Sequence, residues 1–132
     1  MADKIWLGGV STAATAVNQA ANWSPSGVPS GSDNVYITSA STHSIQVDLA
    51  QLAAVTGELH IQKGFTKLIG TSTGYFEMKC SNAFIYASGK AYVDVKASTG
   101  VVEVQNAASG SASEAGLYIK GSALAKLTVA GG

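Results

Sequence analysis

Two carboxylates have the spacing closest to that of an acid–base pair. In a repeat of about 25 residues, Glu77 falls near Glu103, so we expect the two side chains on neighbouring turns of the chain. A pair of carboxylates is the minimum that glycoside hydrolysis requires. Solvated surface groups near Lys79 explain the same pattern, and no further catalytic group accompanies them. We therefore expect a protein that is not an enzyme.

Residues that ligate metals or act as nucleophiles are few and scattered. His43, His60 and Cys80 are the only histidines and cysteine, and none lies in a Cys-x-x-Cys or His-x-x-x-His spacing. A lone thiol with no His and acid close in sequence is expected to be a half-buried core group. No glycine-rich loop is followed by Lys-Ser or Lys-Thr at the start of a helix. We expect no metal, no cofactor and no catalytic residue.

The charge and hydropathy of the chain indicate which classes of binding partner are not expected. Eight lysines balance eight acids, arginine is absent and the formal net charge is zero. Nucleic acid is not expected, because phosphate binding requires a positive surplus and usually uses arginine. A membrane is not expected either, since there is no polybasic cluster and no apolar run of about 18 residues. The first residues lack the apolar segment of a secretion signal, so we expect synthesis in the cytoplasm.

Short strands are the elements that must position these residues. Ala, Gly, Ser and Thr make up 62 of the 132 residues, a share that fits one domain of closely layered β structure with many turns. Runs rich in Val, Ile and Tyr alternate with polar residues and are separated by Gly or Ser. Residues 12–21 and 49–55 are the two segments where a short helix is a candidate. The expected strands are 35–38, 44–48, 58–62, 67–69, 75–80, 83–86, 91–95, 101–105, 117–120 and 124–129.

The strand pattern recurs along the chain. Leu59-His60-Ile61 aligns with Phe84-Ile85-Tyr86 and again with Leu117-Tyr118-Ile119. The second interval shortens to about 25 residues when about eight residues of the segment 106–114, whose core 107–113 is low-complexity, are left out. This repeat predicts an all-β fold, a parallel β-helix (β-solenoid) of about four coils with three short strands per coil. An antiparallel sandwich or barrel is the alternative, although its favoured Asn-Gly and Asp-Gly turns do not occur in the chain.

We expect a single domain in which residues 1–33 form an irregular N-terminal cap and residues 34–132 form the coils. Trp6 and Trp23 both lie in the cap, where we expect them to plug the end of the core; stacking on sugars is the alternative. The strand after residue 124 has no cap segment behind it, so we expect further chain or another protein to cover this end. The expected inward side chains of the coils are Val35, Ile37, Leu59, Ile61, Phe84, Leu117 and Ile119.

The segment that leads into the first coil resembles a known family. Asn22-Trp23 is followed by Gly27-Val28-Pro29 and then by Asp33-Asn34-Val35-Tyr36-Ile37. This run resembles an N-terminal pattern of right-handed parallel β-helix proteins, found in phage virions (head-decoration, cement or tailspike-like proteins) and in autotransporter-like surface passengers. With it, the cap and interaction residues are expected to be Trp6, Trp23, Pro25, Pro29 and Asp33.

The resemblance implies a phage virion structural protein, located in the virion, that binds and stabilises the head as a capsid decoration or cement protein. The implied partners are further copies of the chain, as a homotrimer, and the major capsid protein or another virion protein. A carbohydrate-binding or adhesive module of a fibre or tailspike is the alternative. In that case Trp6, Trp23, Tyr75 and Tyr92 would stack on sugars.

Overall fold

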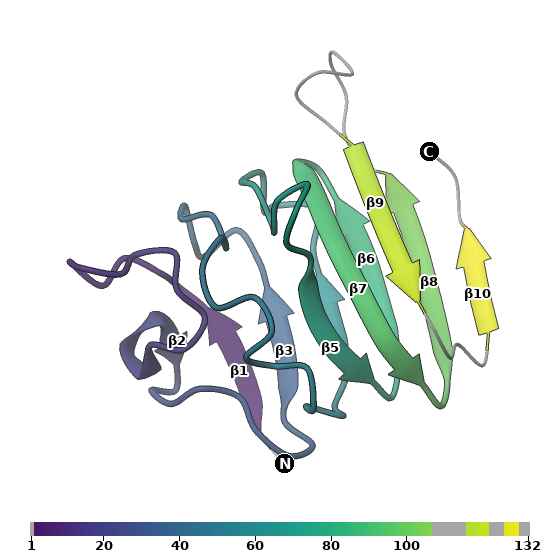
Figure 1. The fold of residues 1–132 in the computed structure, drawn as a ribbon, viewed down its shortest axis with the longest axis horizontal. Coiled ribbons are helices and arrows are strands. Elements are labelled where there is room, and N and C mark those ends of the chain that lie inside the picture. The colour runs from purple at the N-terminus through teal and green to yellow at the C-terminus, as the bar shows by residue number, and fades with distance from the viewer. Residues whose placement is uncertain (1, 107–115, 122–125, 130–132) are drawn as a thin grey trace.

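The protein consists mostly of strands and has almost no helix (Figure 1). The computed structural model describes residues 2–106, 116–121 and 126–129. The expected all-β class is confirmed, but the candidate helices at 12–21 and 49–55 are wrong, since these segments are turns with a single 3-10 helix, η1 (Ala20–Asn22). The strands are β1 (Asp3–Trp6), β2 (Trp23–Ser24), β3 (Asn34–Ile37), β4 (Leu59–Ile61), β5 (Phe76–Cys80), β6 (Ala83–Ala87), β7 (Lys90–Ser98), β8 (Val101–Asn106), β9 (Gly116–Gly121) and β10 (Lys126–Val129).

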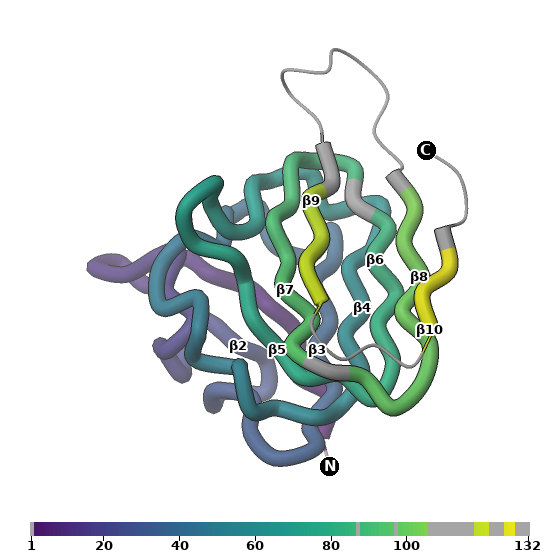
Figure 2. The backbone as a smooth tube through the Cα atoms, turned by 45° about the vertical axis from the view of Figure 1, so that its right-hand side comes forward, coloured from purple at the N-terminus to yellow at the C-terminus, as the bar shows by residue number. Residues whose placement is uncertain are grey.

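Two sheets form the main layers (Figures 1 and 2). The large sheet has seven strands in the order β10-β8-β6-β4-β3-β1-β2, and the small sheet has three in the order β5-β7-β9. Every neighbouring pair is parallel except β1 with β2, which is antiparallel. Parallel neighbours cannot be joined by a tight hairpin, so the chain leaves each sheet and returns to it before the next strand is added.

The interval between neighbouring strands of the large sheet is not constant. Asn34, Glu58, Asn82 and Val101 occupy corresponding places just before or at the start of β3, β4, β6 and β8, and they are 24, 24 and 19 residues apart. The expected uniform repeat of about 25 residues therefore fails between β6 and β8. The low-complexity segment 107–113, to which the irregularity was assigned, lies outside the described residues.

Among the expected inward residues, Phe84 is assigned wrongly, and Leu117 lies in a different sheet from the one that its alignment predicts. Leu59 pairs with Ala83, so Phe84 pairs with His60 and is one position out of the expected register. Because successive side chains of a strand point to opposite faces, this shift places Phe84 on the outer face, where it is half-buried. Leu117 pairs with Ala91 in the small sheet, so its equivalence with Leu59 in the large sheet is also wrong.

The hydrophobic core lies between the two sheets. Val35, Ile37, Leu59 and Ile61 are fully buried in it, and Ile119 is half-buried against it. Ile69 forms isolated parallel bridges with Ile45 and with Ala91 of β7, and all three side chains are buried. The remaining large buried side chains are Trp6, Trp23, Leu52, Phe65, Phe76, Met78 and Ile85.

The segment expected to be an irregular cap contains a strand of the sheet. Asp3, Lys4 and Ile5 of β1 pair in parallel with Asn34, Val35 and Tyr36 of β3, and β2 pairs with the other edge of β1. The large sheet therefore includes strands from the segment 1–33, which was expected to lie outside the coils. The sequence did not reveal β1, because its four residues, Asp-Lys-Ile-Trp, do not alternate between apolar and polar.

Candidate functional site

The two tryptophans close the N-terminal end of the core. Trp6 of β1 and Trp23 of β2 are buried, and their rings meet edge to face at 5.2 Å between centroids. The Trp6 indole N–H donates to the His43 carbonyl at 2.9 Å, and that of Trp23 donates to the Val17 carbonyl at 2.9 Å. Because both rings are buried, neither can present a face to a sugar. The alternative in which these tryptophans stack on sugars is therefore wrong.

Asn22 fixes the loop that wraps around the tryptophans. It is fully buried, and its amide donates to the carbonyls of Ala13 at 2.8 Å and Ala16 at 2.9 Å. Its side-chain oxygen accepts the Val10 N–H at 3.0 Å. The Asn-Trp pair of the family-like segment thus has a structural explanation, with Asn22 holding the loop and Trp23 filling the space below it.

The other expected cap residues shape the turn from β2 to β3. Asp33 accepts the backbone N–H groups of Ser30 and Ala2, both at 3.0 Å. The bond from Ser30 is the main reason that the pKa of this carboxyl lies below its usual value. Pro25 is exposed and follows a cis peptide bond, whereas Pro29 is buried. These three residues therefore lie in one turn beside β1, apart from the small sheet.

The predicted carboxylate pair does not exist. Glu77 of β5 pairs with Asp94 of β7 in the small sheet, whereas Glu103 of β8 pairs with Phe84 in the large sheet. Lys96 Nζ lies 3.4 Å from Asp94 Oδ2 and 3.6 Å from Glu77 Oε1. Asp94 and then Glu77 raise the pKa of Lys96 through their charges. Glu77 therefore belongs to a compact ion-pair cluster on the outer surface.

The histidines and the cysteine also lie apart. Cys80 is buried at the end of β5, and burial raises the pKa of its thiol to about 12. Such a thiol stays protonated at neutral pH and is a poor nucleophile. His43 is exposed in a loop against Gly8 and Gly9, and His60 lies in β4. Among the described residues, no three His, Cys, Asp or Glu side chains gather closely enough to hold a metal ion.

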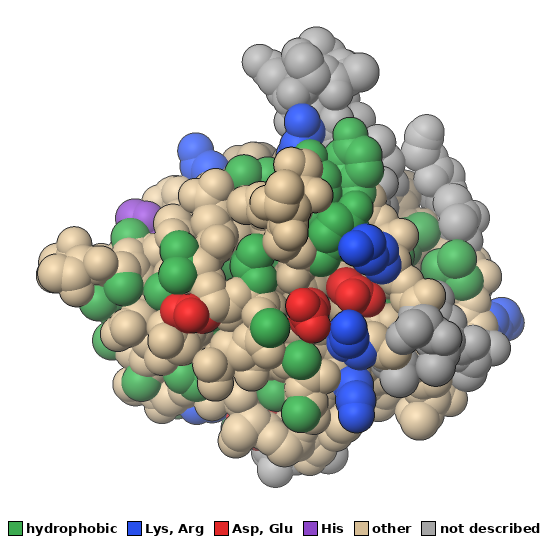
Figure 3. All heavy atoms as spheres, in the orientation of Figure 1, with side chains coloured by type: hydrophobic (Ala, Val, Ile, Leu, Met, Phe, Trp, Pro, Cys, Tyr) green, Lys and Arg blue, Asp and Glu red, His purple; other side chains and the backbone are tan. Residues whose placement is uncertain are grey.

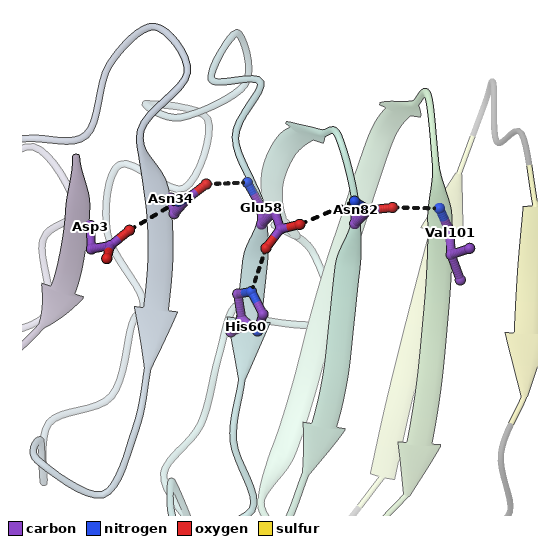
Figure 4. A network of polar contacts seen from close by, with 6 residues as sticks. All are labelled: Asp3, Asn34, Glu58, His60, Asn82 and Val101. Atoms are coloured by element: carbon purple, nitrogen blue, oxygen red, sulfur yellow. Dashed lines mark hydrogen bonds and ion pairs between the residues drawn. The ribbon is translucent and has the colours of Figure 1, made fainter. Parts of the chain in front are cut away.

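A ladder of polar side chains links successive strands of the large sheet (Figure 4). Asn34 Nδ2 donates to Asp3 at 2.9 Å, and Asn34 Oδ1 accepts the Glu58 N–H at 2.9 Å. Asn82 Nδ2 donates to Glu58 at 3.1 Å, and Asn82 Oδ1 accepts the Val101 N–H at 2.8 Å. Sequence reasoning missed this ladder, although three of its polar residues recur every 24 positions at the start of a strand.

A row of stacked rings runs beside the ladder. Tyr36 and His60 stack at 4.6 Å, and His60 stacks on Phe84 at 5.0 Å. His60 Nε2 lies 3.0 Å from Glu58 Oε1. This bond, followed by the one from Asn82, lowers the pKa of Glu58. The imidazole is therefore held on both faces and at one nitrogen.

A second row of rings crosses the outer face of the small sheet. Tyr75 and Tyr92 meet edge to face at 5.5 Å, and Tyr92 stacks on Tyr118 at 4.6 Å with an angle of 11° between the planes. Lys120 Nζ lies 4.3 Å above the centre of the Tyr75 ring, in a cation–π contact. The stacked rings cover each other's faces, but Tyr118, at the end of the row, is 44% exposed.

A hollow of about 410 Å³ lies next to the polar ladder. It is open on one side, and its walls combine apolar surface with hydroxyl, amide and carboxylate groups. The lining residues are Ser32, Asn34, Thr56, Gly57, Glu58 and Ser81.

The two ends of the molecule differ in how completely the core is covered. At the N-terminal end, β2 and the tryptophans cover the core. At the opposite end, β9 and β10 are the outermost strands of their sheets within the described residues. Leu127 of β10 pairs with the buried Val102, yet 52% of Leu127 is exposed, because no described strand lies beyond it.

Comparison with known protein families finds no model that matches the chain, and comparisons with curated proteins and with solved structures also return no match. No helix in the described residues is both long enough and apolar enough to cross a membrane.

Proposed function

We propose that the chain is a parallel β-helix of about four coils whose role is structural rather than enzymatic. The parallel pairing within both sheets supports this proposal, as do the two successive intervals of 24 residues between β3, β4 and β6. Ile69 forms parallel bridges with Ile45 and with Ala91 of β7, so parallel stacking also extends from the small sheet to segments outside the named strands.

The function that fits this body best is that of a capsid decoration or cement protein in a phage virion. The observation that carries the proposal is the difference between the two ends. One end is closed by two buried tryptophans, and the other exposes Tyr118 and Leu127 on the outermost strands of the part of the chain that the structure describes. Apolar side chains beside unpaired strand edges are suited to binding another protein.

The construction of the body also suits a cementing role. The polar ladder connects β1, β3, β4, β6 and β8 in succession, and a ring row connects β3, β4 and β6, in addition to the backbone bonds. The proposed partners of the chain are further copies of itself, in a homotrimer, and the major capsid protein or another virion protein.

The proposal is tested on virions of the phage whose genome would encode the chain. Mass spectrometry of purified virions is expected to find the protein in a fixed ratio to the major capsid protein. Virions made without its gene are expected to release their DNA at a lower temperature, and the added protein should restore the original temperature. Absence from purified virions, or unchanged head stability without the protein, overturns the proposed function.

A carbohydrate-binding role is the second candidate, and Tyr118 is the residue that favours it. Its ring ends the tyrosine row, so its outer face is not covered by Tyr92, and Lys120 lies two residues away in the same strand. A glycan array and fluorescence titration with polysaccharides test this role. Binding that is lost in Tyr118→Ala supports it, and an array without any signal removes it.

A further inference from the structure

The two sheets carry opposite charge on their outer faces. On the large sheet, three carboxylates (Asp3, Glu58 and Glu103) face outward with one lysine, Lys126, which leaves a net charge of −2. On the small sheet, four lysines face outward with two carboxylates, which leaves a net charge of +2; these are Lys79, Lys90, Lys96, Lys120, Glu77 and Asp94. Figure 3 shows the second set gathered over β5, β7 and β9.

This separation stands out because the whole chain is neutral and only 12% charged. Half of its eight lysines lie on the outer face of a three-stranded sheet. Lys4 does not alter the balance, because it pairs with the inward Val35 and its Nζ donates to the carbonyls of Pro25 and Ser26. Both signs occur on each face, but the net charges of the two faces are opposite.

The two outer faces also share an arrangement of aromatic rings. Each bears one row of rings that crosses its strands, Tyr36-His60-Phe84 on the large sheet and Tyr75-Tyr92-Tyr118 on the small sheet. Both rows follow the spacing of neighbouring strands, about 4.8 Å, so their ridges repeat with a common period. Tyrosine is a residue that protein interfaces favour.

We propose that copies of this chain associate through unlike faces, the basic outer face of the small sheet in one copy contacting the acidic outer face of the large sheet in the next. Such a contact is heterologous, so each copy uses both faces and the contacts propagate to a closed ring or a filament. The inference rests on the self-association in the proposed function and is independent of a role in the virion. The occupant of each face is thus a second copy of the chain.

Charge reversal on each face tests the contact separately. Lys79→Glu with Lys120→Glu changes the small-sheet face from +2 to −2, and Glu103→Lys with Gln105→Lys changes the large-sheet face from −2 to +1. Like charges facing each other oppose association, so each double variant alone is expected to lose self-association by about tenfold or more in sedimentation equilibrium. The matched control is Lys63→Glu with Lys67→Glu, which makes the same charge change as the first variant on exposed turns outside both faces. Circular dichroism and thermal melting establish that each variant is folded.

Mixing the two face variants distinguishes this contact from others. The first variant has two acidic faces and the second has two basic faces, so the mixture is expected to form 1:1 complexes that neither forms alone. Raising the salt to about 1 M, where the Debye length falls to about 3 Å, should weaken wild-type association. A wild-type chain that stays monomeric at high concentration overturns both the contact and the proposed self-association. If the charge-reversal variants associate as strongly as the wild type, or if mixing the two variants does not restore association, the proposed contact is wrong but self-association is not. Presence in virions is measured independently and decides only the decoration role.

Discussion

Single residues in this protein act mainly by joining one pass of the chain to the next. Asn22 shows how much can depend on one side chain, since its amide satisfies two carbonyls and one N–H at the closed end of the core. Removing it leaves these buried groups without their partner. An unsatisfied buried polar group costs about 1–3 kcal/mol, so we expect Asn22→Ala to lower the free energy of unfolding by about 3 kcal/mol.

Urea denaturation followed by tryptophan fluorescence measures this effect directly, because Trp6 and Trp23 lie beside Asn22. The matched control is Asn18→Ala, at an exposed position in the same loop, for which we expect a change within about 0.5 kcal/mol. Equal stabilities of the two variants would contradict the role assigned to Asn22.

Glu58 makes a second prediction at this scale. Its pKa in the folded protein is lowered from the usual 4.5, chiefly by the bond from His60 and then by the bond from Asn82. A carboxyl with a lowered folded pKa contributes stability above its unfolded pKa and loses it as the pH falls through the folded value. We therefore expect Glu58→Gln to be less stable than the wild type at pH about 7, with the difference shrinking below about 4.5.

Thermal melting of both proteins across this pH range checks the prediction. The two melting curves should converge under acidic conditions, where Glu58 is neutral in the folded and unfolded states alike. A difference that is constant with pH would mean that the carboxylate charge contributes nothing through the ladder.

At the scale of the elements, the residues just before a strand determine how closely it can approach the neighbouring strand. Gly57 lies immediately before Glu58, and an added Cβ would come within 1.9 Å of the Asp33 carbonyl oxygen. The obstacle is backbone, so the strand itself would have to move. Overpacking of this kind costs about 1–3 kcal/mol, and we expect Gly57→Ala to lie at or beyond the upper limit.

Gly74→Ala is the matched control, because its Cβ would meet the movable Leu49 side chain at 3.2 Å. We expect this variant to change the denaturation midpoint far less than Gly57→Ala does. A Gly57→Ala protein as stable as the control would show that β3 and β4 can separate at their starts without cost.

The sequence revealed strands more reliably than the register between them. Short apolar runs located β3 to β8, because alternate side chains of these strands are buried, although the expected strands 44–48 and 67–69 contain only isolated bridges. The register failed at Phe84 by one residue, and a shift of one residue reverses which side chains face the core. A fixed repeat could not reveal that β6 and β8 start only 19 residues apart, and this shorter interval also separated Glu77 from Glu103.

The candidate surfaces were harder to predict than the fold. A polar residue such as Asn34 or Asn82 is ambiguous in sequence until its register neighbour is known, since its hydrogen bonds cross between strands. Trp6 and Trp23 were predicted as a plug from their position alone, and both are buried. The division of charge between the two sheets depends on which strands share a sheet, which composition does not encode.

At the scale of the whole molecule, the open end gives the last prediction. Leu127 points toward the core side of β10 but is 52% exposed, so it contributes little to the stability of the isolated chain. We expect Leu127→Lys to change the free energy of unfolding by less than about 0.5 kcal/mol. If another protein covers this end in the assembly, the buried lysine would be costly there, and incorporation into virions should fall at least about tenfold. Ile85→Ala is the contrasting variant, because it truncates a fully buried side chain of the large sheet. We expect it to lower the free energy of unfolding of the isolated protein by about 2–5 kcal/mol. Quantitative mass spectrometry of virions, together with urea denaturation of the purified variants, separates the two effects. Normal incorporation of the Leu127→Lys protein would show that this end is not the surface that the capsid covers.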